Sequence, residues 1–161
     1  SVTAPPTVSA ANAEHSLACA AVAAELARCY PGATTAGELV LRLHTGLDIR
    51  VGHDAAGRAL FHRPDLAVWQ HAALPVAVEV ELTVKAPRRL RAICLGWTRS
   101  RGVAGVIYFA SPAVRAPLER ALDAVRAGER VAVLGLPDPD RPVLVRASEA
   151  SQARRSLTDG G

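Results

Sequence analysis

Methionine is absent from this chain of 161 residues, and only 4% of its residues are aromatic. A hydrophobic core must therefore be built mainly from Ala, Val and Leu. Side chains this small require close approach of the elements that carry them, which favours sheets covered by Ala-rich helices. Half of the residues are hydrophobic and 21% are charged, so the composition is that of an ordinary globular domain.

Cysteine is scarce and unpatterned. The three cysteines (Cys19, Cys29 and Cys94) are widely spaced, with no CxxC pair and no Cys/His zinc spacing. The five histidines likewise show no HxH or HxxxH spacing. We therefore expect buried free thiols in a reducing compartment, which indicates a cytoplasmic protein.

Long apolar runs are also missing. The run LACAAVAAELA is interrupted and too short to span a bilayer, and no secretory signal is visible, so we expect a soluble protein that does not contact a membrane. No glycine-rich phosphate loop follows a strand, and no GxSxG elbow is present. We predict a disordered arm at 1–12, one α/β domain at 13–148 and a flexible tail at 149–161.

Hydrophobic periodicity predicts the elements of that domain. A helix is expected over about 14–30, with Leu17 and Val22 on its apolar face. A capping box from Thr35 to Glu38 predicts a second, short helix. The remaining predicted elements are strands over 47–52, 59–62, 66–69 and 76–83, a helix from 86, a strand over 103–110, a helix ending near 128, and strands over 131–136 and 143–146. This order predicts an α/β sandwich with a mixed sheet.

Three carboxylates are the main chemical signal. Along the strand over 76–82, the period of two places Glu79 and Glu81 on one face, about 6.6 Å apart. Asp65 precedes the neighbouring strand, directly after a proline that redirects the chain. Carboxylates that converge repel one another, and a divalent cation relieves that repulsion. The alternative is a plain amphipathic strand with both glutamates in water.

These residues resemble the signature of a nuclease superfamily. His62-Arg-Pro-Asp65, then Glu79-Val-Glu81, then Lys85 is similar to the PD-(D/E)xK pattern. Pro64-Asp65 matches the PD, and Glu79 matches the acidic member of (D/E)xK. Glu81 stands at the usual lysine position. Three interpretations stay open: glutamate serves there, Lys85 reaches back to supply the cation, or the site has decayed and the fold only binds.

The resemblance implies a fold and an activity. Over about 35–136 the element order resembles the restriction-endonuclease-like core, a three-layer sandwich with a central mixed sheet flanked by helices. More narrowly, the pattern is similar to the nuclease-like region of replication-relaxation and related mobile-element proteins from actinobacteria. The implied activity is hydrolysis of DNA phosphodiester bonds with Mg²⁺ or Mn²⁺. The implied alternative is an inactive nuclease-fold module that binds DNA or a protein partner.

The resemblance also implies roles for individual residues. Asp65, Glu79 and Glu81 would hold the metal, and Lys85 would offset charge on the phosphate. Two auxiliary candidates have simpler interpretations. Glu38 is otherwise the capping glutamate of the second helix, and His62 is otherwise a surface strand histidine. A homodimer suits this fold class because cutting both strands requires two sites.

A basic segment follows the carboxylates. The net charge is +4, and the stretch 85–101 holds six cations and no acid. Such a patch attracts polyanions by releasing counterions, although a solvated helix face is the alternative. The residues predicted to position the DNA backbone are Arg88, Arg89, Arg91, Arg99 and Arg101.

Overall fold

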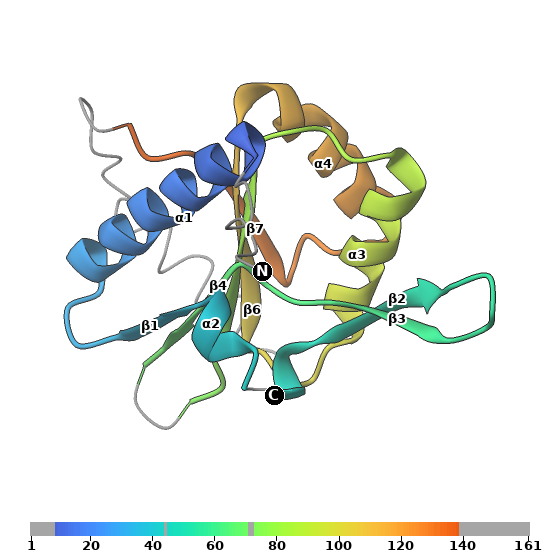
Figure 1. The fold of residues 1–161 in the computed structure, drawn as a ribbon, viewed down its shortest axis with the longest axis horizontal. Helices are drawn as coiled ribbons and strands as arrows, with labels where there is room; N and C mark the ends of the chain where they lie inside the picture. Colours follow the sequence, from blue (N-terminus) through green and yellow to red (C-terminus); the bar gives the residue numbers. More distant parts are fainter. Residues whose placement is uncertain (1–8, 44, 71–72, 139–161) are drawn as a thin grey trace, which may run out of the picture.

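The computed structural model describes residues 9–43, 45–70 and 73–138, and Figure 1 shows their fold. The α-helices are α1 (Ala10–Cys29), α2 (Glu38–Leu41), α3 (Pro87–Arg99) and α4 (Pro112–Ala124). The strands are β1 (Thr34–Gly37), β2 (Ile49–His53), β3 (Ala59–His62), β4 (Leu66–Trp69), β5 (Val76–Glu81), β6 (Gly105–Ala110) and β7 (Val131–Gly135). A short 3-10 helix, Thr45–Leu47, precedes β2.

The central sheet has five strands in the order β1-β4-β5-β6-β7. The first three are antiparallel neighbours, whereas β5, β6 and β7 run parallel. The predicted mixed sheet is therefore confirmed. Strands β2 and β3 form a separate antiparallel hairpin, which projects beside α3 in Figure 1.

Helices cover both faces of this sheet, and each face has its own hydrophobic core. On one face, Val22 of α1 packs in a cluster with Val78 of β5. On the opposite face, Trp97 of α3 and Leu118 of α4 pack in a cluster with Ala77 of β5. The layers are thus helix, sheet and helix (Figure 1). Because β5 lies in the middle, both of its faces are covered.

Helix α1 differs from its predicted limits and orientation. It begins at Ala10, inside the stretch 1–12 predicted as an arm, because the Ser9 hydroxyl caps it by accepting the backbone N–H of Asn12 at 3.2 Å. Leu17, predicted to be buried, is 72% exposed. Glu25 is buried instead, in an ion pair with Arg28.

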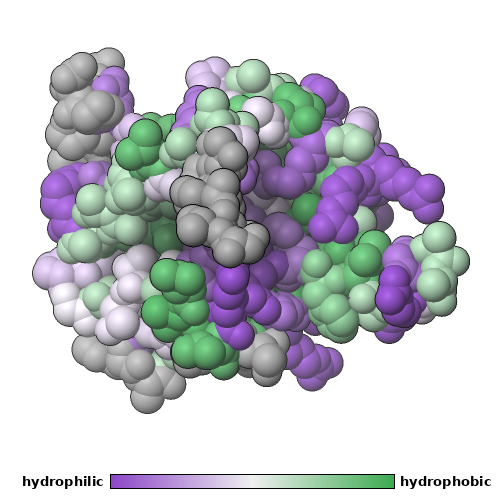
Figure 2. Space-filling view, in the orientation of Figure 1, coloured by the Kyte–Doolittle hydropathy of each residue, from purple (hydrophilic) through white to green (hydrophobic). Residues whose placement is uncertain are grey.

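The capping box predicted from Thr35 to Glu38 was wrong. Thr34–Gly37 forms β1, and Thr35 pairs with Val68 of β4. Only Glu38–Leu41 is helical, so pairing with a distant strand overrides the local helix signal. Figure 2 shows hydrophobic side chains gathered over α2, where Leu39 is exposed.

Two further expectations concern other parts of the chain. The strand predicted over 143–146 lies outside the described residues. Within the described residues, no helix has both the length and the hydropathy that crossing a bilayer requires.

Candidate functional site

The two glutamates of β5 lie inside the protein. They alternate with Val78 and Val80 and so face α3 and α4 together with Ala77. Glu79 is 1% exposed and Glu81 is 4% exposed. The alternative of an amphipathic strand with its glutamates in water is therefore wrong, because α3 covers the face that carries them.

Glu79 is held by two ring nitrogens. His62 Nε2, at the end of β3, lies 2.7 Å from Glu79 Oε1, and the indole Nε1–H of Trp97 donates to the same oxygen at 3.0 Å. The His62 and Trp97 rings meet edge to face, with centroids 6.2 Å apart. His62 is thus part of the site rather than a surface histidine.

Burial and the charges of neighbouring side chains shift the pKa values of Glu79 and His62. Burial raises the pKa of Glu79; His62 opposes that shift, while Asp65 and Glu81 add to it. Burial by itself would lower the pKa of His62, but the Glu79 carboxylate outweighs it, and the net pKa of His62 is raised. The pair therefore holds a proton more tightly than either group does in water.

Asp65 directly precedes β4, the strand that pairs with β5. The register pairs Leu66 with Val78, which places the preceding Asp65 opposite Glu79. The Asp65 Oδ2 accepts the backbone N–H of Val80 at 2.8 Å, and Oδ1 lies 3.1 Å from His15 Nε2 of α1. The hydrogen bond from the Val80 backbone fixes the Asp65 carboxylate beside β5.

Glu81 forms an ion pair with Lys85, which follows β5 in the loop before α3. The end of β5 is also tied to the start of α4, where the Ser111 N–H donates to the Glu81 carbonyl oxygen and the Ser111 hydroxyl donates to the Leu82 carbonyl oxygen, both at 2.9 Å. Lys85 thus reaches back toward the carboxylates, as one interpretation of the sequence requires. Glu38, the other auxiliary candidate, is exposed and ion-paired with Arg42.

The three predicted metal ligands do not meet at one point. Among the described residues, the only trio with ligand atoms all within 4.8 Å of one another is His15, Cys19 and Asp65. Asp65 is close enough to add to the rise in the pKa of Glu79 that burial causes, whereas Glu81 is turned toward Lys85. The three carboxylates therefore have different neighbours: Asp65 contacts His15 of α1, Glu79 contacts His62 and Trp97, and Glu81 contacts Lys85.

Sequence reasoning missed His15, Cys19 and Trp97. His15 and Cys19 are four residues apart, a spacing that places them on one face of a helix, but only Cys/His zinc patterns and histidine pairs were considered. Trp97 lies on the apolar face of α3, and no local pattern in the sequence indicates a partner for its indole nitrogen. Asp65, the partner of His15, and Glu79, the partner of Trp97, lie far away in the chain.

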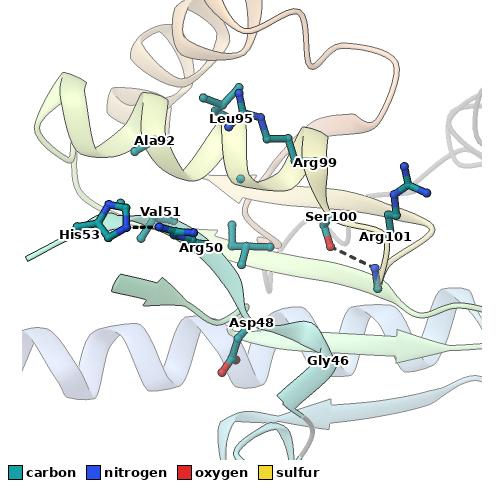
Figure 3. A pocket seen from close by; sticks show the side chains of 14 residues that line it. Gly46, Asp48, Arg50, Val51, His53, Ala92, Leu95, Arg99, Ser100 and Arg101 are labelled. Atoms are coloured by element: carbon teal, nitrogen blue, oxygen red, sulfur yellow. Dashed lines mark hydrogen bonds between the residues drawn. The ribbon is translucent and has the colours of Figure 1, made fainter. Parts of the chain in front are cut away.

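The basic residues fall into two groups. A cleft of about 600 Å³ lies between the β2–β3 hairpin and α3, and its lining includes Arg50, His53, Arg99 and Arg101 (Figure 3). The other predicted arginines, at positions 88, 89 and 91, are exposed on α3 but do not line this cleft. Arg50 was not predicted, because the hairpin's position beside α3 is a tertiary contact.

Two contacts shape this cleft. Gly96 lets the hairpin approach α3, because a Cβ at this position would lie 2.9 Å from Ile49 Cδ1 and 3.2 Å from the Arg50 carbonyl oxygen. At the end of α3, the Arg130 guanidinium donates to the carbonyl oxygens of Ser100 at 2.9 Å and Val103 at 2.9 Å. These hydrogen bonds hold the loop that carries Arg101.

Comparison with protein-family models, curated proteins and solved structures gives no match for this chain. Its function is therefore inferred from the residues described above.

Proposed function

We propose that the protein is a metal-dependent nuclease of the PD-(D/E)xK type that hydrolyses phosphodiester bonds of cytoplasmic DNA, as its sequence resemblance to mobile-element proteins implies. The observation that carries this proposal is the position of Asp65 opposite Glu79, with Lys85 drawn back to Glu81 at the same end of β5. These are the residues that the nuclease signature would bring together.

The order of elements supports the proposal. Helix α1 is followed by the antiparallel strands β1, β4 and β5, then by α3 and the parallel strand β6. The proposal compares this order with the helix, three-stranded meander, helix and strand of the nuclease core, with α2 and the β2–β3 hairpin as insertions. The acidic residues lie at the start of β4 and the end of β5, adjacent in the sheet.

The proposed cofactor is Mg²⁺ or Mn²⁺. These ions prefer carboxylate oxygens and are held by one or two carboxylates, with water completing the coordination sphere. Asp65 and Glu79 supply two carboxylates. The hydroxyl of Tyr108, paired in register with Glu79, is buried and makes no hydrogen bond to the described residues, so water near this group would also satisfy a buried donor. A bound ion would supply a Lewis acid and an activated water.

The protein's own groups have separate tasks in this proposal. His62 and Trp97 hold one oxygen of Glu79 and so fix its orientation. Lys85 supplies the positive charge that faces the phosphate. Arg99 and Arg101 bind the DNA backbone through charge, without reading bases.

Cleavage of supercoiled plasmid and of single-stranded DNA, each with Mg²⁺ or Mn²⁺, tests this function. We expect both Asp65→Asn and Glu79→Gln to lower the rate at least about 100-fold, since each keeps the side-chain shape but removes a charged ligand. Glu119→Gln, on the exposed surface of α4, is the matched control and should cleave normally. Absence of cleavage by the unaltered protein with either ion and either substrate would reject the enzyme.

A second function is favoured by the burial of the same carboxylates. Glu79 and Glu81 are 1% and 4% exposed and already engaged by His62, Trp97 and Lys85, which is the state expected of a module that binds DNA without cutting it. Fluorescence anisotropy with labelled DNA in EDTA tests this alternative. Salt-dependent binding that survives Asp65→Asn, without cleavage, would support it.

Replacing the arginines that line the basic cleft tests whether this cleft binds DNA. Replacing Arg50, Arg99 and Arg101 together by Ala should weaken binding for every sequence and reduce the slope of log affinity against log salt by about three. A comparison variant removes Arg115 and Arg120 from the exposed surface of α4 and should keep most of the affinity. Binding that does not respond to salt would reject both functions.

A further inference from the structure

A second group of metal-ligating atoms lies at the contact between α1 and β4. His15 Nε2 is 3.1 Å from Asp65 Oδ1, and Cys19 Sγ is 3.5 Å from the same His15 nitrogen. One ligand atom from each residue lies within 4.8 Å of the other two. The three atoms are therefore close enough to surround one ion without movement of the backbone.

The fold holds these residues in place. His15 and Cys19 are four residues apart in a continuous helix, so their side chains share one face of α1. Asp65 is fixed independently, because its Oδ2 accepts the backbone N–H of Val80 at 2.8 Å and leaves Oδ1 turned toward α1. One helix and one sheet edge thus present three ligands from rigid elements.

An ion can reach this group from solvent. The side chains of His15 and Asp65 are 40% and 24% exposed, and Cys19 is half-buried. Burial raises the pKa of the Cys19 thiol to about 12, and the carboxylates of Asp65, Glu38 and Glu79 add to this rise, so the thiol would release its proton when a cation binds.

We propose that His15, Cys19 and Asp65 form a binding site for a borderline-soft divalent cation, with Zn²⁺ as the representative ion. An imidazole nitrogen, a thiolate sulfur and a carboxylate oxygen are the ligands that zinc takes in proteins, commonly three with a water in the fourth position. Sulfur is a poor ligand for Mg²⁺, so this donor set selects against the ion of the proposed nuclease.

The site shares Asp65 with the proposed catalytic group, but it does not depend on nuclease activity. Cys19 belongs only to the zinc site and Glu79 belongs only to the catalytic group, so variants of these two residues distinguish the two sites. Loss of the Cys19 thiol should abolish the zinc site and leave Mg²⁺-dependent cleavage intact. Loss of the Glu79 carboxylate should abolish cleavage and leave the zinc site intact.

Titration of the reduced protein with Co²⁺, a spectroscopic substitute for Zn²⁺, tests the site. We expect a thiolate-to-cobalt charge-transfer band and tetrahedral ligand-field bands at one ion per chain, both removed by added Zn²⁺. Cys19→Ser should abolish the charge-transfer band. His15→Gln, at a side chain exposed enough to tolerate the change, should weaken Zn²⁺ binding at least about tenfold.

Cys29→Ser on the same helix is the matched control, because Cys29 lies near Glu25 and outside the group. This variant should keep the band. The proposal is rejected if the unaltered chain shows no charge-transfer band, or if the band survives Cys19→Ser. Binding at millimolar Co²⁺ only, without saturation at one ion, would also reject it. Far-ultraviolet circular dichroism of each variant shows whether the fold is retained.

Discussion

The indole Nε1–H of Trp97 donates to Glu79 Oε1 at 3.0 Å, across eighteen residues of sequence, in a position where both side chains are almost completely buried. His62 approaches the same oxygen at 2.7 Å. Two ring nitrogens at one oxygen hold this buried carboxylate in a fixed orientation. The same burial raises the pKa of Glu79 in the folded protein above its ordinary value.

The first prediction concerns the pH dependence of stability. The pKa of Glu79 is raised above its ordinary value of 4.5, and that of His62 is raised above 6.5. Both groups bind their proton more tightly when folded, so their contribution is fully present below the ordinary pKa and is lost as pH rises through the raised one. Without metal, we expect the free energy of unfolding to fall as pH is raised from about 5 to about 9.

Urea unfolding at several pH values, at constant ionic strength, measures this effect. Glu79→Gln removes the titrating carboxyl but keeps an acceptor for Trp97, so its stability should vary less with pH. Glu119→Gln, at an exposed position on α4, should follow the unaltered protein. Identical pH profiles for Glu79→Gln and the unaltered protein would contradict the prediction.

The second prediction separates the charge of Asp65 from its structural role. Asp65→Ala leaves the backbone N–H of Val80 without its acceptor, at a cost of about 1–3 kcal/mol. Asp65→Asn retains a carbonyl oxygen for that hydrogen bond and should stay within about 1 kcal/mol of the unaltered protein. Denaturant midpoints measure both. Equal losses in the two variants would show that the charge, rather than the acceptor, stabilises this end of β4.

The third prediction concerns Arg130, whose guanidinium donates to the backbone carbonyl oxygens of Thr98, Ser100 and Val103. Arg130→Ala should lower the free energy of unfolding by about 2 kcal/mol and speed hydrogen exchange in the loop after α3. Arg130→Lys should recover only part of the loss, because one ammonium cannot reproduce the planar fork. Arg120→Ala on the exposed surface of α4 is the control, and an equal loss there would contradict the prediction.

The fourth prediction tests the contact between α3 and the hairpin. Gly96→Val places carbon atoms against Ile49 and the Arg50 carbonyl oxygen, and we expect a loss of about 2 kcal/mol. DNA affinity should fall with it if the cleft is the binding surface, since Arg50 would move away from Arg99. Gly128→Val, at a position with open space around it, is the comparison. Unchanged stability of Gly96→Val would show that the hairpin yields without cost.

The local periodicity of apolar residues correctly predicted many of the helices and strands. Strands β3 and β4 have the limits that the sequence predicted, and α3 buries the face that includes Leu90 and Trp97. These features depend on residues within a few positions of one another, where alternation or a helical period is decisive. The same reasoning was wrong for Thr35, because pairing with Val68 outweighed a local capping signal.

The sequence by itself determined the helices and strands that surround the carboxylates, since each of those elements follows from its own pattern of apolar side chains. Only the tertiary structure decided that Glu79 is buried, because one strand's alternation cannot tell whether its polar face meets water or a helix. It also decided that His15 meets Asp65, fifty residues away. Contacts of that kind depend on sheet order and register, which are properties of the whole chain packed together.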